Sequence, residues 1–319
     1  MLRYLALRLA AIVPLLLAVA VISFGLVVIL ELRGSVAQAI LQEGAADPEA
    51  VAVVEAELGL DDPLPIRFGK WLGGVVQGDL GNSLLRRDVA VTTLIGERIW
   101  PTASIAIVGL SLGSGLGIAF GVISGLRPGA RSDRVISVLS GLMIATPGFV
   151  FSMFLVVLFS VRLGWFEPTG YQWPAESGWW AWFKSILLPG VALSLPVVAI
   201  VQRQLRSSMT TALQSRYVLA ARARGVPPGL VVRRHAMRNA MIPTVTVIGF
   251  QAAAAIGLTV AIEQVFAIPG MGTLLIQSIT QRDITVVQGS LMVAAAVVAL
   301  VNLLVDLSYG WLNPRVRLT

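Results

Sequence analysis

Six long apolar stretches constrain this 319-residue chain more than any other feature of its sequence. Each stretch comes near the roughly 20 residues that an α-helix needs to cross a bilayer. Charged residues make up only 13% of the chain, against about 25% in a typical soluble domain. We therefore predict an all-α membrane protein with six transmembrane helices. Their expected ranges are 9–30, 101–126, 135–160, 185–205, 241–262 and 287–310.

The basic residues are distributed in a way that predicts the orientation of the chain. They gather at the N-terminus, between the second and third stretches, in the segment 202–242 and at the C-terminus. The segment 202–242 contains eight arginines and no acidic residue. Cytoplasmic loops of membrane proteins carry such an excess of basic residues. We therefore expect this segment and both termini to be cytoplasmic, and the net charge of +7 needs no nucleic-acid partner.

The expected domain organisation follows from these assignments. Residues 1–30 form the first transmembrane helix, which is too long for the ~7–15-residue apolar region of a signal peptide. Residues 31–100 are expected to form an extracytoplasmic subdomain. It would contain a short helix at 50–58, a break at Pro63 and Pro65, and a turn at Gly78 and Gly81. Residues 101–319 would form a five-helix core with a cytoplasmic loop at about 207–240.

Several kinds of chemistry are excluded by residue content. The chain has no cysteine, which excludes disulfides and thiolate metal sites, and its one histidine excludes a histidine-rich metal centre. Neither Lys70 nor Lys184 lies in a phosphate-binding P-loop sequence. We expect no catalytic residue, metal or cofactor in this chain, so any dependence on ATP must come from a partner.

Small and aromatic residues mark two further features. The second stretch carries a glycine at every fourth position, on one helix face, and we favour close helix packing there over a sliding surface. Five tryptophans lie within 164–184. We favour an interfacial aromatic belt for them, with a substrate or docking vestibule as the alternative. Pro147, Pro189 and Pro196 are expected to kink their helices.

The segment from Tyr217 to Pro243 has the most informative sequence. Its alanines favour a short helix, Gly225 can end that helix, and Pro227 and Pro228 prevent its continuation. A second helix is expected from about Gly229 toward the next apolar stretch. A short, smooth helix flanked by arginines can fill a groove on another protein.

This segment resembles the EAA loop of ABC-importer permeases, in which a pair of small residues precedes a glycine. Ala220, Ala221 and Gly225 fit the spacing, and Leu219 stands where the consensus has glutamate. The run from His235 to Pro243 resembles the dipeptide, oligopeptide and nickel branch of the family. Further motifs of that branch occur in order at 78–83, 146–149, 263–272, 281–283 and 306–315. The chain departs from the branch at Arg33-Gly34-Ser35, where Pro-Gly-Asp is common, and at Asn313, where aspartate is usual.

The resemblance implies a type I ABC importer permease in the bacterial cytoplasmic membrane, in contact with lipid. Its implied partners are a second, homologous permease subunit, two ATPase subunits that hold ATP and Mg²⁺, and an extracytoplasmic substrate-binding protein. It also implies which residues contact the ATPase: Tyr217, Leu219, Ala220, Ala221, Arg222, Arg224 and Gly225. The residues implied to pack the loop are His235, Arg238, Asn239 and Pro243.

The implied substrate is a di- or oligopeptide, with a nickel chelate or another small solute as the alternative. The sequence does not identify substrate-binding residues. A proton-coupled secondary transporter would need ionisable groups inside the spans, where Asp306 is the clearest example. An intramembrane hydrolase would need a catalytic pair or metal site in the spans, and none is present in the sequence.

Overall fold

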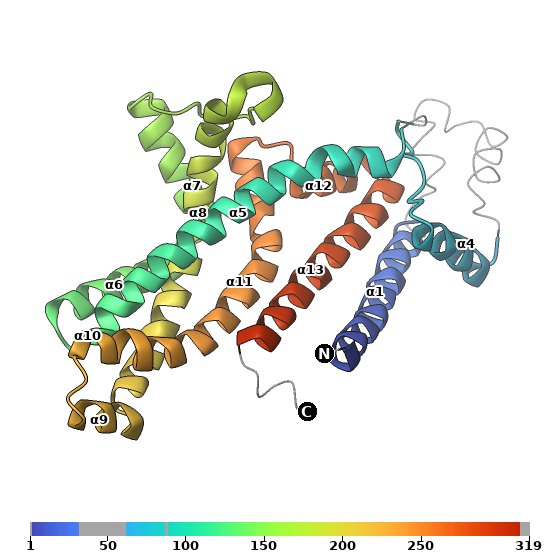
Figure 1. Cartoon of the computed structure of the whole chain (residues 1–319). Helices are drawn as coiled ribbons and strands as arrows, with labels where there is room; N and C mark the ends of the chain where they lie inside the picture. The colour runs from blue at the N-terminus through green and yellow to red at the C-terminus, as the bar shows by residue number, and fades with distance from the viewer. Residues whose placement is uncertain (1, 32–61, 87–88, 313–319) are drawn as a thin grey trace. The chain divides into compact units, whose positions relative to one another are not determined.

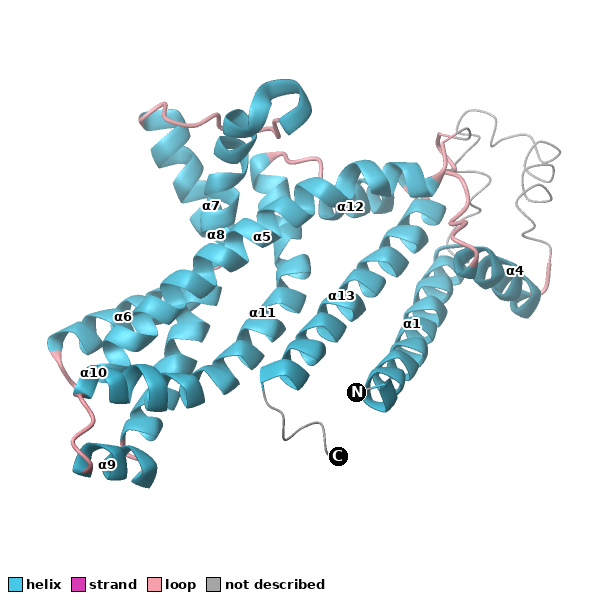
Figure 2. Cartoon of the chain, in the orientation of Figure 1, coloured by secondary structure: helices cyan, strands magenta, loops and turns pink. Residues whose placement is uncertain are grey.

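The computed structural model describes residues 2–31, 62–86 and 89–312 (Figure 1). Helices joined by short loops make up these ranges, and the described residues contain no strand beyond an isolated bridge between Asn82 and Ala90 (Figure 2). The chain forms two compact units. Unit 1 comprises Pro101–Pro269 and the segment from Leu300 onward, and unit 2 comprises Leu2–Trp100 and Gly270–Ala299.

Five of the described helical segments are long and apolar enough to cross a membrane. Four of them are α1 (Leu2–Glu31), α5 (Val91–Leu126), α8 (Pro174–Leu213) and α13 (Ile284–Leu312). Helix α8 is interrupted near its start by non-helical backbone at Gly178, with φ +82°. The fifth runs without interruption through α10 (Pro228–Leu230), the π-helix η3 (Val231–Ala236) and α11 (Met237–Phe266). These five segments confirm five of the six predicted spans.

The third predicted span, 135–160, is broken rather than continuous. Its first part is α6 (Arg131–Ala145), and its second part is α7 (Gly148–Leu155) with the π-helix η2 (Val156–Arg162). The two parts meet at an angle of 99°. Pro147 disfavours helical backbone at the preceding residue, and Thr146 is accordingly extended, with ψ 117°. The kink expected at Pro147 is therefore present, at the break between the two parts of this predicted span.

Unit 2 contains two helices that the sequence did not predict, α4 (Leu64–Val76) and α12 (Met271–Gln281). Pro63 and Pro65, which we expected to end the preceding short helix, stand at the start of α4, because proline lacks only a donor that the first helical turn leaves unused. The turn expected at Gly78 and Gly81 is confirmed, with φ of +84° and +78°. The short helix expected at 50–58 lies outside the described residues.

Two sequence motifs that lie 200 positions apart meet in unit 2. The Asp283 carboxylate accepts hydrogen bonds from the Ser83 hydroxyl and, at 3.2 Å, from the Leu84 backbone N–H. The same carboxylate accepts a longer bond, 3.4 Å, from the Val286 N–H in the first turn of α13. Asp283 thus begins α13 and also ties down the turn that follows α4.

A ladder of glycines packs α5 against α8 in unit 1. A Cβ added at any of these glycines would lie 2.6 to 2.8 Å from a side-chain atom of α8, closer than real Cβ contacts. Successive glycines of α5 face successive turns of α8. The pairs are Gly109 with Leu193, Gly113 with Val197, Gly117 with Val201, Gly121 with Leu205 and Gly125 with Met209. This confirms the close packing that we favoured for these glycines.

Candidate functional site

The short helix α9 (Arg216–Ala223) projects beyond the ends of α8 and α10 (Figure 1). It starts after the turn at Ser215, whose backbone carbonyl accepts the N–H groups of Val218 and Leu219 at 3.1 Å. The helix therefore forms where the alanine-rich sequence predicted it. It belongs to unit 1, as do α8, α10 and α11.

The end of α9 is set by Gly225, as expected. Its φ is +77°, a left-handed conformation that glycine adopts without a Cβ penalty. The Gly225 N–H donates to the Arg222 carbonyl at 2.9 Å, and the Val226 N–H donates to the Ala221 carbonyl at 3.2 Å. These two bonds form a Schellman motif. Nothing lies within 4 Å of a Cβ added at Gly225, so only the backbone conformation requires glycine there.

The two faces of α9 differ in exposure. Val218 and Ala221 are fully buried against Val231, with Val226 packed on the same cluster. On the other face Leu219 is 54% exposed, and Tyr217 and Ala220 are exposed beside it. Apolar side chains at the tip of a projecting helix are suited to a groove on a partner.

The residues predicted to contact the ATPase therefore do not all lie on the exposed face of α9. Ala221 lies inside the loop rather than on its outer face, because its methyl group completes the small core with Val218 and Val231. Arg222, Arg224 and Gly225 are exposed. Their contact with an ATPase remains a prediction, and for Ala221 the structure supports an indirect role through loop packing.

The residues predicted to pack the loop also separate into two kinds. His235 is half-buried in η3, and Pro243 is half-buried inside α11. Arg238 and Asn239 are exposed, and the packing role expected for them stays a prediction. The one hydrogen bond described for the Asn239 side chain is local, to the His235 carbonyl at 3.1 Å.

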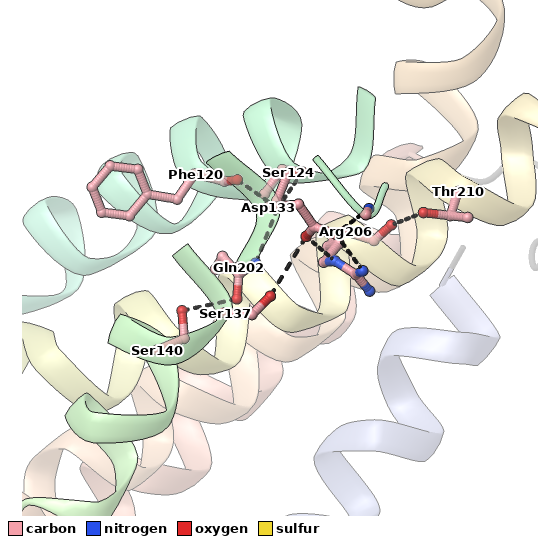
Figure 3. Close-up of polar contacts among 10 residues, drawn as sticks. Phe120, Ser124, Asp133, Ser137, Ser140, Gln202, Arg206 and Thr210 are labelled. Carbon is pink, nitrogen blue, oxygen red and sulfur yellow. Dashed lines mark hydrogen bonds and ion pairs between the residues drawn. The ribbon is translucent and has the colours of Figure 1, made fainter. Parts of the chain in front are cut away.

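An ion pair between a buried carboxylate of α6 and a partly exposed arginine of α8 joins the two helices (Figure 3). Arg206 donates from Nε to Asp133 Oδ1 at 2.5 Å and from Nη2 to Oδ2 at 2.7 Å, a bidentate arrangement. The Gly129 N–H, in the turn between α5 and α6, donates to the same Oδ2 at 2.7 Å. The Asp133 side chain is 4% exposed. One carboxylate therefore holds α8, the start of α6 and the preceding turn.

A second polar connection lies next to the ion pair. The fully buried Gln202 side chain of α8 donates from Nε2 to the Ser124 hydroxyl of α5 at 3.0 Å. Its Oε1 accepts a bond from the Ser140 hydroxyl of α6 at 2.9 Å (Figure 3). Buried polar groups that are satisfied in this way make an arrangement specific, because each would be costly if left unpaired. The end of α8 that leads into α9 is thus fastened to both α5 and α6.

Sequence reasoning missed Asp133, Arg206 and Gln202. One signal was available, since Asp133 is the only acidic residue between Glu97 and Glu167 and lies in an arginine-rich region. Its partner could not be chosen from the many nearby arginines without the packing of α6 on α8.

The remaining sequence-based hypotheses concern tryptophans and Asp306. Trp179 and Trp180 are exposed, whereas Trp182 is half-buried and donates to the Tyr171 hydroxyl at 2.8 Å. The exposed pair is compatible with both a membrane belt and a vestibule, so our preference for the belt remains a prediction. Asp306 lies in α13, and its side chain is outside the part that the structure describes. Among the described residues no cluster of three or more His, Asp or Glu could hold a metal.

Comparison with known proteins gives consistent matches. A sequence model described as "Binding-protein-dependent transport system inner membrane component" matches residues 117–318, and the model of the corresponding N-terminal part matches residues 1–92. A Brucella ovis protein named as a peptide permease is 39% identical over 322 residues, covering all of both chains. The glutathione transport system permease protein GsiC of Pectobacterium atrosepticum is 36% identical, covering 99% of each.

Among solved structures, a chain of the inward-facing MetNI methionine ABC transporter is similar to this one. It is 19% identical, with a TM-score of 0.57, and the match covers 69% of this chain and 96% of the other. At this identity the likeness concerns the fold alone.

Proposed function

Because this chain belongs to the family of binding-protein-dependent transport system inner membrane components, we propose that it imports peptides as the permease subunit of an ATP-driven transporter. It is a multi-pass inner-membrane protein of the ABC-importer permease class, whose members are not themselves catalytic. In our proposal it moves di- or oligopeptides by alternating access, while partner ATPases hydrolyse ATP.

The peptide substrate is supported by the names of the relatives. One is named as a peptide permease and another as a glutathione permease, and glutathione is itself a tripeptide. A nickel chelate or another small solute is the alternative within the same family. We further propose a complex with a second permease subunit, two ATPase subunits and an extracytoplasmic binding protein.

The observation that carries the mechanism is the exposed outer face of α9. Tyr217, Leu219 and Ala220 leave apolar surface free on a helix that projects from unit 1. We propose that this face inserts into a groove on an ATPase subunit. When the ATPases close on ATP, α9 would move as a rigid element and carry α8 with it.

The fastening of α8 makes such transmission effective within unit 1. Its end is bound to α6 through Asp133 and to α5 through Ser124. Farther along, the glycine ladder brings the backbones of α5 and α8 together. A displacement of α9 would therefore move three helices rather than bend one, because tightly packed elements shift as units.

The test places a bulky side chain on each face of α9 in turn, with a control substitution on α8. Ala220→Trp adds bulk on the exposed face, where no internal contact is disturbed, and Ala175→Trp is the control at an exposed site near the start of α8. We expect Ala220→Trp to insert normally but to lose ATPase co-purification, or to lose substrate-stimulated ATP turnover at least about tenfold. The control should retain both.

A third variant separates contact from loop folding. Ala221→Trp should also uncouple the complex, but with increased protease sensitivity of the loop, because it overfills a buried site. Wild-type co-purification and turnover in Ala220→Trp would show that the outer face of α9 is not the ATPase contact.

A further inference from the structure

One face of α8 near α9 is exposed and polar, although α8 buries most of its surface in unit 1. Helix α8 packs against α5, α6, α7 and α11. Over its final turns and at its C-cap four side chains remain exposed at spacings of three or four residues, which places them on one side of the helix. They are Arg203, Ser207, Thr211 and Gln214.

The depth of Arg203 can be read from its neighbours on α6. The Nη2 atom of Arg203 lies 3.8 Å from where a Cβ at Gly141 would be, so its guanidinium lies beside α6 at that level. Gly141 follows Arg134 by seven residues, which at 1.5 Å per residue is about 10 Å along the helix. Arg134 is the last charged residue of α6. Arg203 therefore lies beside the uncharged part of α6, about 10 Å along the helix from Arg134.

Over this interval the outer surface of α6 is suited to hydrocarbon. Val135 is 58% exposed and Val138 is 64% exposed, and Leu142 is exposed one turn farther. No charged residue follows Arg134 within α6. A guanidinium turned toward lipid at the same level would be costly, and charged groups at such depths mark solute or ion pathways.

Arg203 also has no hydrogen-bond or ion-pair partner among the described residues. The nearest carboxylate on α6, that of Asp133, already holds Arg206 in two bonds. The Arg203 guanidinium can therefore bind an external anion, on a face whose other exposed side chains carry hydroxyl and amide groups. A guanidinium binds carboxylates through paired hydrogen bonds, which single out that chemical group.

We infer that the face of α8 formed by Arg203, Ser207, Thr211 and Gln214 lines the solute pathway at its α9 end, where Arg203 binds a carboxylate of the solute. The inference rests on the proposed function, since it assigns a role along the pathway of a peptide permease. It names the free C-terminal carboxylate of a peptide as the group bound. The hydroxyl and amide groups beyond Arg203 would offer hydrogen bonds to the solute as it leaves.

Water access is the first test. Single cysteines replace Arg203, Ser207 and, as the lipid-facing control, Val138 in the complete complex, reconstituted in vesicles. A water-soluble methanethiosulfonate reagent should modify the first two at least about tenfold faster than the third, because thiols react as hydrated thiolates. If Arg203→Cys and Ser207→Cys react as slowly as Val138→Cys, lipid or a second subunit covers this face, and the inference fails.

Substrate chemistry is the second test. Uptake of dialanine is compared with uptake of dialanine amide in Arg203→Gln, Arg203→Lys and the control Arg134→Gln. We expect Arg203→Gln to raise the KM for dialanine about tenfold while changing that for the amide less than about twofold, with partial recovery in Arg203→Lys. An equal loss for both peptides would overturn the carboxylate assignment.

The outcomes distinguish this inference from the proposed function. ATPase co-purification and basal ATP turnover should be normal in every Arg203 variant, since α9 is untouched. If the wild-type permease purifies without ATPase subunits, that result contradicts the proposed function and not the role of Arg203. A wild-type complex that takes up neither dipeptide overturns the peptide substrate and the carboxylate assignment together, while the labelling pattern still decides whether this face of α8 lines the pathway.

Discussion

At the scale of single residues, the glycines of α5 differ according to the face on which they lie. Gly117 faces α8, and a Cβ there would lie 2.7 Å from the Val201 Cβ and 3.0 Å from the Val198 backbone carbonyl oxygen. Gly115, on the same helix, has nothing within 4 Å of an added Cβ. Both glycines cost helix stability equally in principle, so only the contact with α8 distinguishes them.

We predict that Gly117→Ala destabilises the permease and that Gly115→Ala does not. The methyl group at position 117 must displace α8 backbone, and overpacking of this kind costs about 1–3 kcal/mol. At position 115 the gain in helix propensity leaves stability unchanged or raises it by up to about 1 kcal/mol. Thermal unfolding of the purified complex in detergent measures both. Equal unfolding midpoints for the two variants would contradict the packing role of the ladder.

At the scale of elements, α6 depends on polar contacts with α8 for its position. The helix has no side-chain hydrogen bond at its N-cap, Ala130. Its first turn instead supplies Asp133, which binds Arg206 and the Gly129 N–H. Farther along, the Ser140 hydroxyl binds Gln202. These contacts hold α6 beside α8 before the chain turns sharply at Pro147.

A double-mutant cycle on Asp133→Ala and Arg206→Ala should give a coupling free energy of about 1.5–3 kcal/mol, the range for hydrogen bonds to charged groups. Asp133→Ala alone should cost more than Arg206→Ala, because it also leaves the Gly129 N–H without its acceptor. Arg134→Ala is the matched control, since Arg134 is the neighbouring exposed arginine. Additive effects of the two substitutions would show that the pair contributes no mutual stabilisation.

At the scale of the whole molecule, the distribution of basic residues predicts which ends of the helices face the cytoplasm. The arginine-rich α9 region should be inside, and the tryptophan-rich region at the start of α8 should be outside. Trp179 is 68% exposed, and Arg224 is exposed at the end of α9. Both positions are exposed, so cysteines placed there would be accessible to a reagent on their own side of the membrane.

The absence of natural cysteines makes this orientation testable by labelling. In spheroplasts, a membrane-impermeant maleimide should label Trp179→Cys and leave Arg224→Cys unlabelled until the membrane is permeabilised. Labelling of both after permeabilisation is the control for reactivity. Labelling of Arg224→Cys in sealed spheroplasts, with Trp179→Cys protected, would reverse the orientation.

Much of the fold was predictable because lipid imposes a simple rule on sequence. A segment that crosses a bilayer must satisfy its backbone within one helix and present about 20 apolar residues. Five predicted spans are accordingly present, and the stop at Gly225 and the packing glycines of α5 are confirmed. Each of these depends on local sequence or on residue size alone.

Other features were decided only by tertiary structure. Ala220 and Ala221 are identical in type, yet one is exposed and the other is buried, because the return of the chain at Val231 covers one side of α9. Arg203 and Arg206 are three residues apart, yet only Arg206 meets a carboxylate of α6. The sequence by itself determined where the long apolar helices lie and where α9 ends, since backbone hydrogen bonding and glycine conformation are local. The faces and partners of those helices come from contacts between distant segments, which exist only once the helices pack.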